Sequence, residues 1–351
     1  TYAMDLARGL NARGTEVILA TMGGPMSASQ REEVAAMRGL RVIESSFKLE
    51  WMEEPWADVD AAGQWLLELE HRFAPDIVHL NGYAHGALPW RTPVLVVGHS
   101  CVLSWWHAVK GEPAPSNWQV YAQRVSQGLK HASIVAAPTQ AMLNIMEEHY
   151  GPLPGARVLY NGRSEELFRT TRTKKPYIFA AGRLGDEAKN IQTLGTAAEE
   201  LPWPVFVAGP ESDASGSGLL PTNLTHCGKL CPTALAEWMG GASIYCLPAR
   251  YEPFGLSILE AALSGCALVL GDIPTLRELW NGCACFVPPD DPAALRHTLA
   301  GLIADPARRE SLAAAAQLRG RKFSITRFTE GYLDTYRRML ATPQRSQSLA
   351  A

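Results

Sequence analysis

Several features that the sequence lacks exclude whole classes of protein. No run of about 18 apolar residues occurs, so we expect no membrane-spanning helix. No basic, apolar signal segment stands at the start of the printed sequence. The formal net charge is only −3, so nothing predicts a nucleic-acid partner. We expect a cytoplasmic protein, and peripheral membrane contact stays open but gains no support from the charge.

The spacing that is typical of metal sites is also lacking. The seven cysteines include two close pairs, Cys227/Cys231 and Cys283/Cys285, but neither has the two-residue gap of a zinc site. Asp58-Val59-Asp60 resembles the short acidic motif of metal-dependent transferases of another fold. This motif begins a predicted helix, however, where acidic residues favour the helix dipole. We therefore expect free thiols, no metal and no cofactor.

Short apolar strands alternate with helices in the first half of the chain. The strands are expected at residues 17–20, 41–43, 76–80, 93–98, 133–137 and 158–160. The helices between them are expected at residues 1–13, 31–38, 58–73, 117–130 and 140–150. This alternation predicts a parallel sheet that is covered by helices on both faces.

The second half repeats the pattern. Strands are expected at residues 177–181, 205–208, 243–247 and 267–270, and helices at 190–200, 232–239, 257–264, 293–304, 306–319 and 326–340. The short, polar and basic stretch at 169–176 marks the boundary between the halves. The chain is thus an α/β protein with two doubly wound domains, at residues 1–168 and 169–322. A final helix at 323–341 is expected to cross back to the first domain, followed by a frayed tail from Thr342.

Two cations follow the first strand of the second domain. Arg183 and Lys189 are six positions apart, on the loop that leads into the helix near Asn190. Such a loop, next to a helix N-terminus, is suited to binding phosphate. Two solvated surface cations would give the same pattern, so this pair alone leaves both interpretations open.

A second motif follows the strand that ends at Leu247. Ser257 can cap the next helix, with Glu260 completing a capping box, but this local role does not account for Glu252. Gly255 permits close approach of the backbone, and free amides at the helix start favour an anion. A carboxylate nearby can accept hydrogen bonds from ribose hydroxyls. Phosphate and vicinal hydroxyls in one site predict a nucleotide sugar as ligand.

Taken in order, these motifs resemble the signature of retaining family 4 glycosyltransferases of the GT-B fold. The resemblance covers nearly the whole chain and rests on Glu252 and Glu260 with seven residues between them, Arg183 with Lys189, Asn161-Gly162, Gly209, and Gly265 with Pro274. It implies two Rossmann-like domains facing a central cleft. The first domain would lie on the acceptor side, and the second would bind the nucleotide sugar.

The resemblance also implies an activity. The enzyme would be a retaining, metal-independent hexosyltransferase with a UDP- or GDP-linked donor and a saccharide, lipid-linked or small-molecule acceptor, as in polysaccharide biosynthesis. Arg183 and Lys189 would bind the diphosphate and neutralise the leaving group. Glu260 would hold the ribose, and Glu252 would face the sugar ring. Further donor contacts would come from Gly209, Phe254, Gly255, Leu256 and Ser257.

His99 stands at the end of a predicted strand of the first domain, where the family has a histidine near the reacting sugar. A structural histidine that lines the cleft is the alternative. Trp105 and Trp106 follow it and are candidate contacts for the acceptor, with buried packing or a lid as the alternative.

The sequence departs from the family in two places. The family has a Gly-rich loop just before the helix that begins here at Thr1, so we expect that loop, and a first strand, upstream of Thr1. Asp186-Glu187 stand inside the loop between Arg183 and Lys189, where they can pair with these cations or tune the choice of donor. A UDP-sugar epimerase of the same fold and a non-catalytic sugar-nucleotide binder remain as alternatives. A nicotinamide-dependent dehydrogenase is disfavoured, because no Gly-x-Gly-x-x-Gly follows a strand.

Overall fold

The structure is a computed structural model that describes residues 2–35, 37, 39–168, 173–210 and 220–341. It divides into two compact units, which are described separately. The first unit comprises residues 1–104, 113–159 and 325–351, and the second comprises 105–112 and 160–324. Part of the predicted domain boundary, at 169–172, and the predicted frayed tail lie outside the described residues.

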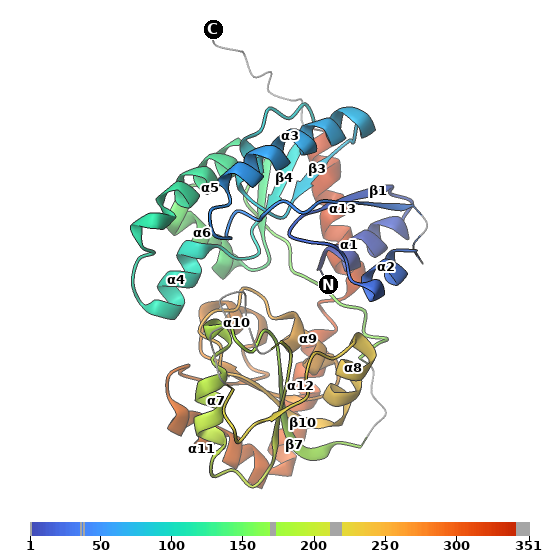
Figure 1. Cartoon of the computed structure of the whole chain (residues 1–351). Coiled ribbons are helices and arrows are strands. Elements are labelled where there is room, and N and C mark those ends of the chain that lie inside the picture. Colours follow the sequence, from blue (N-terminus) through green and yellow to red (C-terminus); the bar gives the residue numbers. More distant parts are fainter. Residues whose placement is uncertain (1, 36, 38, 169–172, 211–219, 342–351) are drawn as a thin grey trace. The chain divides into compact units, whose positions relative to one another are not determined.

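The second unit is built on a six-stranded parallel sheet (Figure 1). In spatial order the strands are β12 (Cys285–Val287), β11 (Ala267–Gly271), β10 (Ala242–Leu247), β7 (Lys175–Ala181), β8 (Val205–Ala208) and β9 (Thr225–His226). The connecting helices are η3 (Glu187–Lys189), α7 (Ile191–Ala198), α8 (Pro232–Gly241), α9 (Leu256–Leu263), α10 (Pro274–Trp280), α11 (Pro292–Ala304) and α12 (Pro306–Gly320). This strand order is that of a Rossmann fold, in which the order reverses between β7 and β10.

Both faces of this sheet are buried, as the apolar strands predicted. On one face Ile178 of β7 and Ile244 of β10 pack with residues of α7 and α11. On the other face Phe179 and Tyr245 pack with residues of α8 and α9. Figure 1 shows α7 and α11 on one side of β7 and β10, with α8 on the other. Asp305 caps α12, because its side chain accepts a hydrogen bond from the amide of Arg308.

The first unit has parallel strands in two separate sheets. One sheet has the order β3 (Val78–Leu80), β4 (Val94–Val97), β5 (Ile134–Ala137) and β6 (Arg157–Val158), and the other pairs β1 (Val17–Thr21) with β2 (Leu40–Glu44). The helices are α1 (Tyr2–Asn11), α2 (Ala28–Ala35), α3 (Trp56–Phe73), η1 (Ala84–Ala87), η2 (Ser116–Trp118), α5 (Gln119–His131) and α6 (Gln140–Tyr150), while α4 (Val102–Lys110) is divided between the units after Ser104. The sequence predicts a single sheet, which is wrong for the described residues because strand partners depend on non-local contacts that periodicity does not report.

The last helix, α13 (Ile325–Ala341), packs against α1 within the first unit. Phe328 and Tyr332 join Leu6 and Leu10 in one hydrophobic cluster. Leu340 does not share this face, because its side chain is 55% exposed. Residues four apart drift around a helix of 3.6 residues per turn, so Met339 takes the buried place instead.

Among the helices of the described residues, none combines the length and the hydropathy that crossing a bilayer requires.

The carboxyl ends of β7 and β8 meet at two glycines. Gly209 follows β8 with φ +141°, a conformation that is nearly restricted to glycine. A Cβ atom added there would lie 1.7 Å from the carbonyl oxygen of Gly182, which follows β7. The two backbones therefore touch, and no side chain fits between them.

Replacing Gly209 by alanine should separate these strand ends. We expect Gly209→Ala to lower the free energy of unfolding by roughly 3 kcal/mol or more, since backbone strain adds to the clash. Gly228→Ala is the matched control: Gly228 also has a positive φ, but no atom lies within 4 Å of an added Cβ. This control should lose only about 1 kcal/mol in urea unfolding, and equal losses in both variants would contradict the close approach.

Candidate functional site

The two predicted motifs follow the two strands at which the sheet order reverses. Arg183 comes just after β7, and the segment 249–260 comes just after β10. β7 and β10 are parallel neighbours, so both motifs lie at the carboxyl edge of the sheet. Their loops are joined by a hydrogen bond of 2.9 Å from the amide of Arg250 to the carbonyl oxygen of Ala188. Ligands of doubly wound sheets bind at this position.

Lys189 and Glu252, predicted separately, form an ion pair. Lys189 Nζ lies 2.7 Å from Glu252 Oε2, and the two side chains are 13% and 14% exposed. The Thr275 hydroxyl fixes the backbone of Glu252 by donating to its carbonyl oxygen at 2.7 Å. Because water screens this pair little, either partner would be poorly stabilised alone.

Arg183 has a different environment. Its side chain is 71% exposed, and Nη2 lies 2.8 Å from Asp186 Oδ2. The other oxygen of Asp186 accepts from the amide of Ala188 at 3.0 Å and so caps η3. Burial raises the pKa of Asp186, but the hydrogen bond from Arg183 and the charge of Lys189 outweigh it and lower this pKa below its usual value. Asp186 thus pairs with Arg183, which is predicted to bind phosphate. Glu187 pairs with Lys110.

The start of α9 corrects the predicted cap. Gly255 is the N-cap, with φ +82°, and the helix begins at Leu256 without a side-chain cap. The Ser257 hydroxyl instead lies 2.8 Å from Tyr245 Oη. A Cβ at position 255 would meet Ile258 at 2.6 Å, so glycine is required there. The capping box of Ser257 and Glu260 is therefore wrong, and the local explanation for these two residues no longer applies.

Glu260 is almost fully buried and has a partner that the sequence did not predict. Arg163 Nε lies 2.8 Å from Glu260 Oε1, and the two side chains are 12% and 7% exposed. Arg163 follows the Asn161-Gly162 pair directly. No spacing rule joins residues so distant along the chain, so no sequence signal could have identified this contact.

The remaining predicted donor contacts are mainly backbone. The Phe254 side chain is buried and packs edge-on against Phe323 at a centroid distance of 5.6 Å, so only its backbone is available to a ligand. The carbonyl oxygen of Gly209 lies 2.8 Å from His226 Nε2. Leu256 is partly buried at the start of α9.

His99 lies just after β4 in the first unit. Its Nε2 is 2.9 Å from Asn81 Oδ1, and its ring packs edge-on against Tyr2 at a centroid distance of 4.2 Å. Burial lowers the pKa of His99 to about 4, so the imidazole is neutral at pH 7. With Nε2 donating to Asn81, Nδ1 is the acceptor.

The two predicted acceptor contacts lie on α4. Residues 105–112 are grouped with the second unit, and Trp105 Nε1 donates to Asp186 Oδ1 at 3.2 Å. Trp106 packs edge-on against Trp105, with ring centroids 5.9 Å apart. Trp106 Nε1 is buried and has no hydrogen-bond partner among the described residues. Contact of either ring with an acceptor stays a prediction.

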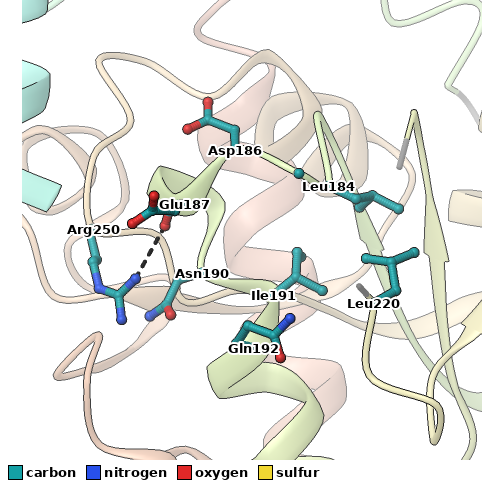
Figure 2. Close-up of a pocket in the computed structure, with 9 residues that line it drawn as sticks. Leu184, Asp186, Glu187, Asn190, Ile191, Gln192, Leu220 and Arg250 are labelled. Atoms are coloured by element: carbon teal, nitrogen blue, oxygen red, sulfur yellow. Dashed lines mark hydrogen bonds between the residues drawn. The ribbon is translucent and has the colours of Figure 1, made fainter. Parts of the chain in front are cut away.

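A cavity of about 280 Å³ lies beside the loop that carries the predicted cations (Figure 2). Leu184, Ile191 and Leu220 line one side, and Glu187 and Arg250 lie toward the other. Among the described residues that line it, none belongs to the predicted site. We therefore do not assign the donor to this cavity.

The acidic motif Asp58-Val59-Asp60, the alternative metal site, makes contacts within the protein. Asp60 Oδ1 lies 2.5 Å from Arg124 Nη1, and Asp58 accepts from the amide of Lys48 at 3.2 Å. Within the described part of the chain, no cluster of three or more His, Cys, Asp or Glu side chains could hold a metal. All seven cysteines are free thiols.

Two family profiles together match most of the chain. The profile described as Glycosyltransferase Family 4 matches residues 1–167, and that described as Glycosyl transferases group 1 matches residues 163–319. The D-inositol 3-phosphate glycosyltransferase of Xylanimonas cellulosilytica is 34% identical over 387 aligned residues, which cover 95% of this chain and 90% of that protein. The chain belongs to glycosyltransferase family 4. The predicted family and the predicted transferase activity are thereby confirmed.

Solved structures agree on the fold of this glycosyltransferase. Sucrose-phosphate synthase from Thermosynechococcus elongatus has a TM-score of 0.82 at 18% identity, covering 97% of this chain and 93% of that chain. The Anabaena protein HepE, in complex with UDP-glucose, has a TM-score of 0.76 at 16% identity, covering 96% and 94%. At such identities the likeness shows the fold, and the predicted GT-B fold with two Rossmann-like domains is confirmed.

The low pKa of His99 makes the stability of this glycosyltransferase depend on pH. The pKa falls from 6.5 to about 4 on folding, so the unfolded chain binds more protons between these values. The free energy of unfolding should therefore decrease as the pH falls from about 6.5 to about 4. His99→Gln should reduce this slope in urea unfolding without abolishing it, because burial also lowers the pKa of His79, to about 3. His131→Gln, at an exposed position of α5, is the control. An NMR titration with a His99 midpoint near 6.5 would contradict the effect of burial.

Proposed function

We propose that this glycosyltransferase moves a hexose from a UDP- or GDP-linked donor to its acceptor with retention of the anomeric configuration and without a metal. The observation that carries the proposal is the Lys189–Glu252 ion pair at the strand reversal, close along the chain to Glu260 and Arg183. A cation for phosphate and a carboxylate for sugar hydroxyls are thus in direct contact in one site.

The donor diphosphate is held by Arg183 and Lys189 and by the amide end of α9. Its ribose hydroxyls donate to Glu260. When the phosphate takes Lys189 as partner, the Glu252 carboxylate is released to accept hydrogen bonds from the sugar ring. The complexes of HepE with UDP, and with UDP-glucose, support a uridine nucleotide as the first candidate.

Catalysis rests on charge stabilisation. The bond from the anomeric carbon to the diphosphate oxygen breaks, and the negative charge that develops is stabilised by the guanidinium and the ammonium. The acceptor hydroxyl attacks from the face of the leaving group, and the departing phosphate oxygen takes its proton. No enzyme nucleophile is required. Glu260 therefore need not attack the sugar, in agreement with its burial against Arg163.

The first unit supplies the acceptor side in this proposal. His99, neutral and held by Asn81, is the hydrogen-bond partner of a donor-sugar hydroxyl. The names of two relatives that cover at least 95% of this chain, both D-inositol 3-phosphate glycosyltransferases, make a phosphorylated polyol the first acceptor to try. We further propose a cytoplasmic reaction, which the seven free thiols support because they suit a reducing compartment.

Donor binding can be tested by thermal shift with UDP, GDP, ADP and their hexoses. We expect one diphosphate and its sugar to raise Tm, because a ligand at 100 times its Kd stabilises the folded state by about 2.7 kcal/mol. Glu260→Ala should weaken binding about 10- to 100-fold through the lost ribose contact. Glu310→Ala removes an exposed carboxylate of α12 and should bind like the wild type. A panel in which no nucleotide shifts Tm would contradict the proposal.

The stereochemistry of transfer is tested by NMR of the product. With an α-linked donor and a phosphorylated inositol or a saccharide acceptor, the new anomeric proton should show an α linkage. EDTA should leave the initial rate unchanged. A β-linked product, or a rate that EDTA abolishes and Mg²⁺ restores, would overturn the corresponding part of the proposal. Conversion of the donor without an acceptor would instead support the epimerase.

A further inference from the structure

We infer that Arg163 is a positioning residue for nucleotide recognition, which holds the ribose-binding carboxylate of Glu260 in place. This inference rests on the proposed function, since it assigns a partner to the ribose contact. Its basis is the buried ion pair, in which Arg163 Nε lies 2.8 Å from Glu260 Oε1.

The backbone of Arg163 is held from one side. Its amide donates to the carbonyl oxygen of Phe323 at 3.0 Å, and the residue forms a parallel β-bridge with Ser324. The side chain is held from another side, because its guanidinium carbon lies 5.1 Å from the centroid of the Phe168 ring. These contacts leave the guanidinium little freedom to follow a moving carboxylate.

Glu260 is anchored on the other side of the pair. It lies within α9, a helix whose start is fixed by Gly255. Burial of a carboxylate is unfavourable unless a cation or hydrogen bonds compensate for the lost water. Arg163 supplies that compensation, and a carboxylate accepts about four hydrogen bonds, so this contact leaves capacity for ribose hydroxyls.

The pair has two consequences for a bound nucleotide. First, a carboxylate that a buried cation holds at one oxygen loses less freedom when it meets the two ribose hydroxyls. Second, the guanidinium balances the negative charge of Glu260, which would otherwise repel the donor diphosphate. The first effect belongs to ribose recognition and would be absent if Arg163 only stabilised the fold; the second acts alike on ribose and deoxyribose ligands.

The test compares ribose with deoxyribose ligands. Calorimetric titration of the full chain with UDP, 2′-deoxy-UDP and 3′-deoxy-UDP, and with the guanosine series, gives the affinity ratio of ribose over deoxyribose. We expect about tenfold or more for the wild type, because hydrogen bonds to a charged group are strong. In Arg163→Met the ratio should fall to about threefold or less. Arg163→Lys keeps the positive charge but lacks the planar guanidinium. It should therefore also lower the affinity ratio of ribose over deoxyribose most of the way to that of Arg163→Met.

Arg277→Met is the matched control. Like Arg163, Arg277 forms an ion pair, with Asp272, and lies over an aromatic ring, that of Phe286. It should keep the wild-type ratio. A folded Arg163→Met with an unchanged ratio would overturn the inference, as would an unchanged ratio in Arg163→Lys if the methionine variant does not fold. Failure of the wild type to bind any nucleotide would instead overturn the proposed function.

Discussion

The pairing of β7 with β10 is the constraint on which the second unit depends. These two strands are buried neighbours that run parallel, although two strands and their helices separate them along the chain. The sheet order reverses between them, and their carboxyl ends carry the two segments that form the site. A change of register here would move Arg183 and Lys189 away from Glu252, so the geometry of the site is set by backbone pairing in the core.

The predicted cations and carboxylates of the proposed donor site are paired with one another before any ligand enters. Asp186 pairs with Arg183, Glu252 with Lys189, and Glu260 with Arg163. In the pair of Asp186 with Arg183 the carboxylate is buried, but the guanidinium is 71% exposed and hydrated, so Arg183 can turn to a phosphate. The pair of Lys189 with Glu252 is less solvated, and its separation is favourable only if phosphate and sugar replace both partners together. In the proposed function this links recognition of the diphosphate to recognition of the hexose.

The proximity of Lys189 and Glu252 in this candidate site was predictable from sequence, for a physical reason. Residues that directly follow apolar strands lie at the carboxyl edge of a parallel sheet, so Arg183, Lys189 and Glu252 could be assigned to one site from their order alone. Contacts between distant segments left no such pattern, which is why Arg163 was missed. The prediction of a helix cap from local sequence failed because tertiary contacts decide the start of α9. Gly255 is the N-cap, and the Ser257 hydroxyl is hydrogen-bonded to Tyr245 instead. The short strands β9 and β12 and the helix α10 were also missed, because two to seven residues give too little periodicity.

The packing of α13 against α1 has a consequence for synthesis on the ribosome. The cluster that contains Leu6 and Leu10 is completed by Phe328, Tyr332 and Met339. The first unit therefore cannot complete this cluster until α13 has been translated. The second unit draws all but a short stretch of its residues from one continuous segment, 160–324, so its core can assemble earlier. The unit that contains α1 is thus expected to complete its core after the second unit.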